Sequence, residues 1–211
     1  KFRDVLDGLS NTIAAAEIST SNGNREINSD WIRGFPASIE ENPNTCKTGT
    51  HIDPERPQFY ATGVGMHGNG SDQCKGCRWA DFRPMYTSFT TILPPNSPSC
   101  QRGGGDYNEG IHSAGSRHQG GAHVLMGDGA VVFMTDSVEA GDPTHAPIER
   151  GSSALPDWRG PGTDPGSPSP DGLWGALGPR AGQETIEVQL NQERVAAPAN
   201  CTSPPLEGGG F

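Results

Sequence analysis

The chain has 211 residues, of which 32% are hydrophobic, and it contains 30 glycines, 19 prolines and a formal net charge of −10. This length suffices for one domain, but the low hydrophobic content limits the core, so we expect an ordered domain with much loop. The acidic balance argues against a nucleic-acid-binding protein, because a phosphate backbone requires clustered lysine and arginine.

The first third of the chain contains two short apolar segments and a long loop. Residues 12–18 are small and apolar and fit a strand or a helix, and Trp31 to Phe35 form a second apolar segment that could pair with the first as a strand. Residues 36–57 are rich in Asn, Glu and Pro and have little to bury. Loops of this length often form contact surfaces.

The middle of the chain contains a polar turn followed by the richest aromatic segment. Residues 67–72 carry oxygen-bearing side chains that could bind calcium, but no closing glutamate of an EF-hand loop follows, so an ordinary turn is favoured. Residues 78–93 include Trp79, Phe82, Tyr86, Phe89, Ile92 and Leu93, most of which we expect in the core. If the protein is a binding module, three of them form its surface: Trp79, Phe82 and Tyr86.

Residues 116–138 predict a β-hairpin. Alternating residues from His123 to Met126 form the first strand, Asp128-Gly129 supplies a two-residue turn, and Val131 to Met134 form the returning strand. His118 begins the approach to this hairpin, where we expect its ring to hydrogen-bond a backbone carbonyl and fix the loop.

The C-terminal part predicts a surface loop, a docking patch and a tail. Residues 139–171 are rich in Pro, Gly and Ser, and an apolar patch at 173–177 could dock this loop onto the domain. Residues 185–190 alternate as a strand, and residues 196–211 look extended. We therefore expect one β-rich head domain over 1–195, with long surface loops at 36–57 and 139–171, and a tail over 196–211.

Five blocks of the sequence resemble those of a large bacterial family with an H-x(9)-D-G signature. The signature lies at His118, Asp128 and Gly129. The first of the other blocks is Asp7-Gly8-Leu9-Ser10-Asn11-Thr12-Ile13, which continues to Glu17. The remaining three are Arg78-Trp79-Ala80-Asp81, then Ile92 to Cys100, and finally Gly172 to Gly178 together with Arg180-Ala181-Gly182. Full-length members of that family begin with a prepilin-type cleavage and methylation segment and a long apolar helix.

The resemblance implies that the chain is the mainly β, loop-rich C-terminal part of an α+β pilin-like protein. The chain opens almost directly on the first block, so the N-terminal helix of the family, its only expected membrane contact, would lie upstream. Two departures stand out: Phe82 replaces the usual glycine after the Arg-Trp-Ala-Asp block, and the segment after Arg194 extends past the usual end.

Five cysteines favour disulfides and an exported protein, at the cell surface, in the periplasm or outside the cell. Bridges from Cys46 to Cys100 and from Cys74 to Cys77 would leave Cys201 free, although the sequence does not fix the connectivity. The Cys74-Lys75-Gly76-Cys77 segment could instead be half of a zinc site, but a second C-x-x-C pair is missing.

The histidines provide the only candidate for metal-dependent catalysis. His112, His118 and His123 lie near Asp128 in the sequence, but His123 and Asp128 would stand roughly 16 Å apart along an extended strand and cannot share an ion there. No nucleophile elbow, Walker loop or dinucleotide fingerprint is present, so we expect a structural role for the signature, no catalytic residues and no cofactor.

The sequence therefore leads to a non-enzymatic, exported, pseudopilin-like structural subunit. We expect it to form a homo-oligomer or an assembly with other pilin-like subunits, and to contact the upstream part of its own precursor. The alternative is a cell-surface module that binds a glycan or another protein. A metal-dependent enzyme would require the histidines to converge with a carboxylate.

Overall fold

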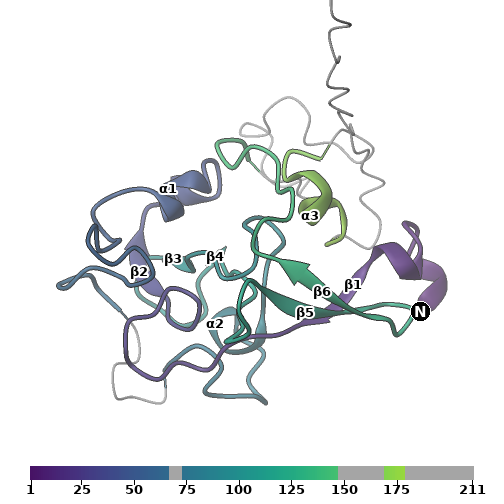
Figure 1. Cartoon of the computed structure of the whole chain (residues 1–211), viewed down its shortest axis with the longest axis horizontal. Coiled ribbons are helices and arrows are strands. Elements are labelled where there is room, and N and C mark those ends of the chain that lie inside the picture. Colours follow the sequence, from purple (N-terminus) through teal and green to yellow (C-terminus); the bar gives the residue numbers. More distant parts are fainter. Residues whose placement is uncertain (67–72, 147–168, 179–211) are drawn as a thin grey trace, which may run out of the picture.

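A computed structural model describes residues 1–66, 73–146 and 169–178, and the fold is mainly β (Figure 1). The strands are β1 (Ile13–Ala16), β2 (Ile32–Phe35), β3 (Cys100–Arg102), β4 (Gly110–Ile111), β5 (Gly121–Met126) and β6 (Val131–Thr135). The α-helices are α1 (Asn44–Lys47), α2 (Pro84–Thr87) and α3 (Gly172–Ala176), and the 3-10 turns are η1 (Phe2–Asp4), η2 (Leu9–Asn11) and η3 (Ala37–Ile39).

The first sheet has the order β1-β5-β6 and is antiparallel throughout. Of the strand and the helix that residues 12–18 fitted, the strand implied by the family resemblance is confirmed as β1. The predicted hairpin is confirmed as β5 and β6. Strand β1 pairs with β5 from Ile13 opposite Met126 to Ala16 opposite Val124. Because β5 lies in the middle, β6 is an edge strand of this sheet.

The turn of the hairpin is one residue longer than predicted. The Gly129 amide donates to the Met126 carbonyl at 3.0 Å and the Met126 amide to the Ala130 carbonyl at 2.8 Å, which encloses a three-residue loop over 127–129. A two-residue turn of the predicted kind needs a positive φ at both central residues, but only Gly129 has one, at 93°. Asp128 instead accepts a hydrogen bond from the Ala130 amide at 3.0 Å.

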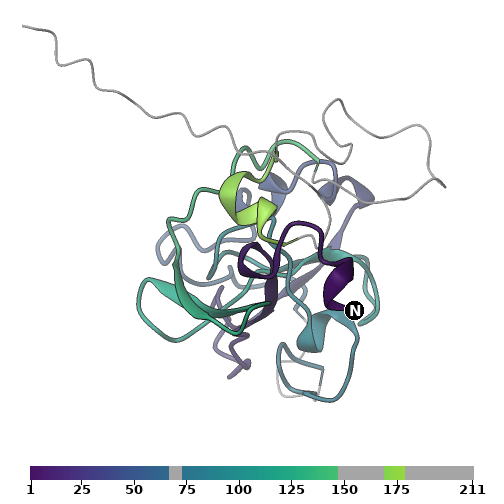
Figure 2. The same cartoon turned by 90° about the vertical axis from the view of Figure 1, so that its right-hand side faces the viewer.

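Helix α3 covers one face of the first sheet. Its Trp174 is fully buried, packs with Ile13, Val124 and Met126, and donates its indole N–H to the Leu93 carbonyl at 2.8 Å. The predicted docking of the apolar patch at 173–177 is therefore confirmed. Figure 2 shows α3 beside the strands after a quarter turn of the view.

The second sheet has the order β2-β3-β4, with β2 parallel to β3 and β3 antiparallel to β4. The expected pairing of Trp31–Phe35 with the first strand is wrong, because Ile32 lies opposite Cys100. Around this sheet lies the larger core cluster, which includes Ile39, Tyr60 and Leu93.

The loop over 36–57 buries more than its composition indicates. It forms η3 and α1, and Ile39 and Cys46 have no exposed surface. The Cys46–Cys100 disulfide ties α1 to β3 beneath the second sheet. Ile39, the bridged Cys46 and the partly buried Ile52 thus pack a largely polar loop against the core.

A buried lysine connects the loops between the two sheets. The Lys75 ammonium donates to the Ser113 carbonyl at 2.8 Å and to the Ser99 hydroxyl at 3.1 Å, and it lies 3.4 Å from the Asn28 carbonyl. Burial lowers the pKa of Lys75 to about 8, against the opposing effect of the negative charge of Asp30.

Several expectations fall outside the described residues: the polar turn at 67–72, the strand at 185–190, Arg180 to Gly182, the tail at 196–211 with Cys201, and most of the loop at 139–171. Within the described ranges, no helix has the length and apolar character needed to span a membrane.

Candidate functional site

Glu17 brings a carboxylate to the signature histidines. It follows β1 directly and extends the β1–β5 ladder, since its amide donates to the His123 carbonyl at 3.0 Å and its carbonyl accepts from the Gly115 amide at 2.9 Å. Its carboxylate oxygen Oε2 accepts a hydrogen bond from the His123 amide at 2.9 Å. The backbone hydrogen bonds of Glu17 to His123 and Gly115, together with the bond from the His123 amide to Oε2, therefore fix the position of this carboxylate.

Two imidazoles face the other oxygen of Glu17. His123 Nδ1 lies 3.3 Å and His118 Nε2 lies 3.5 Å from Glu17 Oε1. The two rings pack edge to face with centroids 5.0 Å apart, and the His123 ring also contacts Phe133 at 5.0 Å. A ligand atom from each of the three side chains lies within 4.8 Å of the others.

The electrostatics of this cluster favour an ionised carboxylate. Partial burial opposes ionisation of Glu17, but hydrogen bonds from the His123 amide, the Ser116 hydroxyl and the His123 ring outweigh it and hold the pKa of Glu17 below its usual value. The neighbouring Arg117 does not neutralise this charge, because its guanidinium pairs with Glu26 at 3.0 Å and with the Thr20 carbonyl at 3.0 Å.

The structure separates the other members of the sequence cluster. Asp128 lies at the hairpin tip, apart from the histidines, and the ring of His112 is buried against Trp31 with centroids 6.5 Å apart. The expected carbonyl partner of the His118 ring is replaced by Glu17. Sequence reasoning missed Glu17 as a site residue, although it ends the first family block.

The face of the first sheet opposite α3 is apolar and open to solvent. Leu125 pairs with Val131, and His123 pairs with Phe133, so these four side chains share one face. Val131 is 67% exposed, Phe133 42% and Leu125 39%. The Glu17–His118–His123 cluster borders this open face, because His123 belongs to it.

A second apolar feature is the loop over residues 78–83. Trp79 is 88% exposed and Phe82 is 90% exposed, so the expectation that most of this aromatic segment enters the core is wrong for these two. Tyr86 is buried in a cluster with Trp31 and Met85, which removes it from the possible binding surface.

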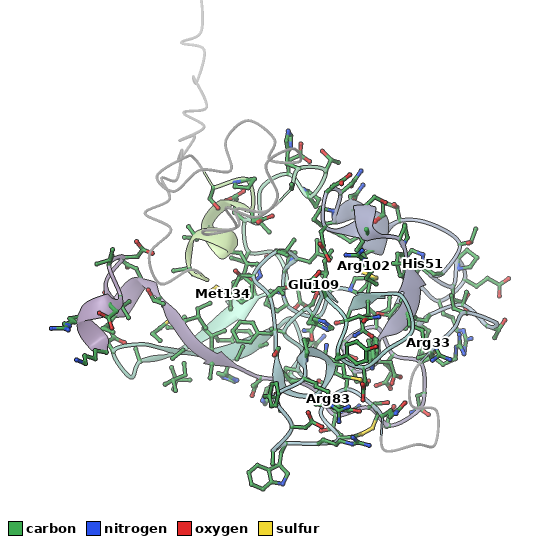
Figure 3. All side chains as sticks on the ribbon, turned by 180° about the vertical axis from the view of Figure 1, so that it is seen from behind. Arg33, His51, Arg83, Arg102, Glu109 and Met134 are labelled. Carbon is green, nitrogen blue, oxygen red and sulfur yellow. A yellow bond between two sulfur atoms is a disulfide. The ribbon has the colours of Figure 1, made fainter. Side chains whose placement is uncertain are left out.

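Arg83 anchors this aromatic loop. Its guanidinium binds both carboxylate oxygens of Asp81 and one of Asp106, and the Tyr86 hydroxyl donates to Asp106 at 3.0 Å. The hydrogen bonds from Arg83 lower the pKa of Asp81 to about 2. Burial, followed by the hydrogen bond to Asp106 and then the negative charge of Asp106, raises the pKa of Tyr86 to about 12. In Figure 3, Arg83 lies on the side of the molecule away from α3.

The Cys74–Cys77 disulfide borders the same loop on its N-terminal side. Both predicted bridges, Cys46–Cys100 and Cys74–Cys77, are therefore present in the structure. The bridged sulfurs of Cys74 and Cys77 are not available as thiolate ligands, so this segment is not half of a zinc site.

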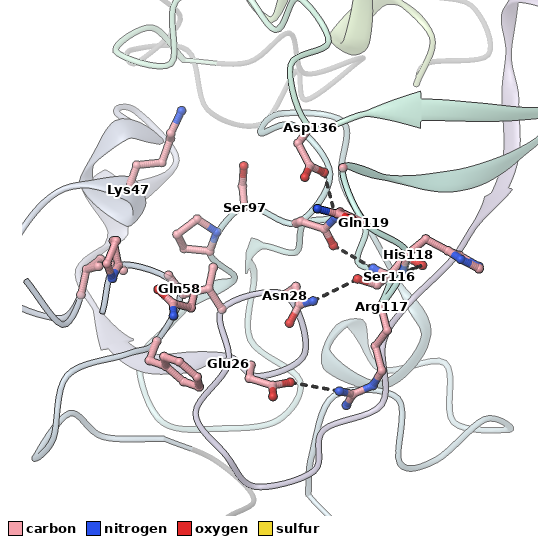
Figure 4. Close-up of a pocket in the computed structure, with 17 residues that line it drawn as sticks. Glu26, Asn28, Lys47, Gln58, Ser97, Ser116, Arg117, His118, Gln119 and Asp136 are labelled. Atoms are coloured by element: carbon pink, nitrogen blue, oxygen red, sulfur yellow. Dashed lines mark hydrogen bonds and ion pairs between the residues drawn. The ribbon is translucent and has the colours of Figure 1, made fainter. Parts of the chain in front are cut away.

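A cavity of about 790 Å³ opens between the loops beside the hairpin (Figure 4). Its polar lining groups largely bond one another: Asn28 donates to the Ser116 carbonyl at 2.9 Å, Asn96 donates to Asp136 at 2.7 Å, and Arg117 pairs with Glu26. The ring of His118 points away from this cavity. His118 lines the cavity and also belongs to the histidine cluster, so the two features adjoin on the surface.

These features define a mainly β, disulfide-bonded domain with a histidine–carboxylate cluster and two exposed apolar surfaces. Residues 1–141 match the family described as protein of unknown function (DUF1559), and the chain belongs to that family. No curated protein matches the chain, and no solved structure matches it.

Proposed function

We propose that this chain is the head of an exported, non-enzymatic, pseudopilin-like structural subunit, and that the open face of its first sheet contacts a neighbouring subunit. The observation that carries the proposal is the exposed apolar face formed by Leu125, Val131 and Phe133. Contiguous exposed apolar surface on a folded domain marks an interaction site.

Strand β6 supplies Val131 and Phe133 to this face, and its place at the edge of the described sheet favours association with another chain. Strand β6 is an edge strand, so its outer backbone groups can pair with another chain. Natural edge strands usually carry charged side chains, prolines or bulges that block such pairing. Strand β6 has the sequence Val-Val-Phe-Met-Thr, which contains no charged residue and no proline. Its pairing with β5 contains no bulge.

Two further observations support an exported location. The two disulfides are typical of proteins in oxidising compartments, and Cys46 and Cys100 lie in the core, where the bond is part of the packing. The resemblance to prepilin-type proteins points the same way.

The proposal is tested by imaging the native, full-length protein by electron microscopy, with mass spectrometry of the same material to define its N-terminus. We expect ordered filaments or other regular assemblies. Phe133→Lys places a charge on the open face and is expected to abolish them. Tyr107→Lys, which adds the same charge at a more exposed aromatic residue between β3 and β4, is expected to leave them intact.

Monomers of the native protein under all salt and calcium conditions would contradict an assembly subunit. Equal assembly by the Phe133→Lys and Tyr107→Lys variants would show that the open face is not the contact.

A second candidate function, a cell-surface module that binds a glycan or a protein, is favoured by the exposed aromatic pair Trp79 and Phe82. Arg83 and the Cys74–Cys77 bridge fix both ends of their loop, which reduces the entropy lost on binding. On an array of bacterial glycans, Trp79→Ala is expected to lose any signal that the wild type gives, with unchanged thermal stability. Signal retained by Trp79→Ala, or no signal from the wild type, would argue against glycan binding through this loop.

A further inference from the structure

The three side chains beside the open sheet face are suited to a transition metal. We infer that Glu17, His118 and His123 form a surface zinc site, in which Glu17 Oε1, His118 Nε2 and His123 Nδ1 are the ligands and water completes the coordination. This inference is independent of the proposed assembly.

The distances among the three donors agree with tetrahedral zinc. Zinc binds imidazole nitrogen and carboxylate oxygen at about 2.0–2.2 Å, so two ligands at a tetrahedral angle stand roughly 3.3–3.5 Å apart. His123 Nδ1 and His118 Nε2 lie 3.3 Å and 3.5 Å from Glu17 Oε1. The third pair of donors, His118 Nε2 and His123 Nδ1, lies within 4.8 Å, and the exposed His118 side chain has space to turn towards an ion.

The carboxylate is already oriented by neighbouring groups. The His123 amide holds Glu17 Oε2 at 2.9 Å, which leaves Oε1 directed at the two rings. His118 is placed by its own amide, which donates to the Ser116 hydroxyl at 3.1 Å. Outer hydrogen bonds of this kind orient metal ligands and raise affinity.

Charge and access also favour a cation here. Glu17 supplies a negative charge, and Arg117, which precedes His118 in the chain, is directed to Glu26. The His118 side chain is 59% exposed, so an ion reaches the donors directly from solvent. Two imidazoles and one carboxylate suit zinc and its neighbours in the transition series, whereas calcium prefers six or more oxygen ligands.

The three ligands lie on separate segments, so a bound ion would connect them. Glu17 follows β1, His123 lies in β5, and His118 belongs to the approach to the hairpin. Three protein ligands with an open position also occur at catalytic zinc ions.

The test is isothermal titration of the full chain with ZnCl2, and titration with CoCl2 followed by the visible absorption of tetrahedral Co2+. All forms carry Cys201→Ser, so that the fifth cysteine cannot bind metal, and lack a histidine tag. We expect one saturable zinc site and a higher Tm with zinc, with no such effect of CaCl2.

The variants identify the ligands. His118→Ala is expected to weaken zinc binding by about tenfold or more and to remove the Tm increase, and Glu17→Gln is expected to weaken binding without loss of fold. His145→Ala is the matched control, because His145 Nδ1 lies 3.2 Å from Asp142 Oδ2 in an exposed pair with no third ligand among the described residues. It is expected to bind zinc like the parent.

Absence of saturable zinc binding would overturn the inference. So would equal zinc affinity in the His118→Ala and His145→Ala variants. Assembly of the native protein in the presence of a chelator is a separate readout, so a failure of the zinc site and a failure of the proposed function are distinguishable.

Discussion

His112 lies in a part of the core that disfavours its charged form. Burial, followed by the positive charge of Lys75, lowers the pKa of His112 to about 3 from 6.5. Its Nε2 has no hydrogen-bond partner among the described residues, and its ring packs edge-on to Trp31. In the folded state, a proton added at Nε2 therefore gains no hydrogen bond to a described residue.

The pH dependence of stability follows from this shift. Below pH 6.5 the unfolded chain binds a proton at His112 that the folded chain does not, so the free energy of unfolding falls as pH falls from 6.5 towards 3. The slope from this one group approaches about 1.4 kcal/mol per pH unit. We expect His112→Phe, which keeps a buried ring, to remove that slope.

Urea denaturation between pH 6.5 and 5 measures this effect above the range where most carboxylates titrate. His145→Phe, at an exposed position, is the control and should retain the wild-type slope. Parallel pH profiles for wild type and His112→Phe would contradict the assignment.

At the level of single residues, the sequence allowed the disulfide partners to be predicted but not the cluster around Glu17. Cysteines are few and their chemistry is specific, so a short list of pairings could be written. Glu17 and His123 are far apart in the chain, and only the β1–β5 register places them in contact. Nothing local to residue 17 indicates that register.

The β5–β6 hairpin is the element whose geometry depends most on one residue. Gly129 has a φ of 93°, in the left-handed region, and an added Cβ meets nothing within 4 Å, so the conformation alone disfavours other residues. Gly129→Ala is expected to reduce the free energy of unfolding by about 1–2 kcal/mol. Thermal or urea denaturation checks this value.

Gly104→Ala is the matched control, because its Cβ also meets nothing within 4 Å and its φ is not in the left-handed region. If Gly129→Ala is no less stable than Gly104→Ala, the left-handed turn does not hold the hairpin in place.

Elements formed by neighbouring residues were predictable, and elements formed by distant ones were not. The hairpin and the apolar patch around Trp174 have strong local patterns, and both are present. Strands β3 and β4 have three and two residues, too few to show a periodicity. The parallel pairing of Ile32 with Cys100 also has no turn signal, because the two strands lie far apart in the sequence.

For the molecule as a whole, the two disulfides should contribute unequally to stability. Cys46–Cys100 closes a loop with a sequence separation of 54, and Cys74–Cys77 one with a separation of 3. Loop-closure entropy gives about 4 kcal/mol for the first and about 2 kcal/mol for the second. Replacing each pair by alanine and measuring urea unfolding should reproduce this order.

The Cys74/Cys77 double variant is thus the control for the Cys46/Cys100 double variant. A greater loss of stability from the Cys74/Cys77 pair would mean that the bridge beside the aromatic loop, and not the one in the core, holds the fold together.

The pairing of β1 with β5 also determines when the first sheet can form during synthesis. During synthesis the ribosome releases β1 early, yet Ile13 pairs with Met126, which emerges much later. Until β5 appears, the nascent β1 has no partner within its own chain, and the first sheet can close only when most of the chain has been made.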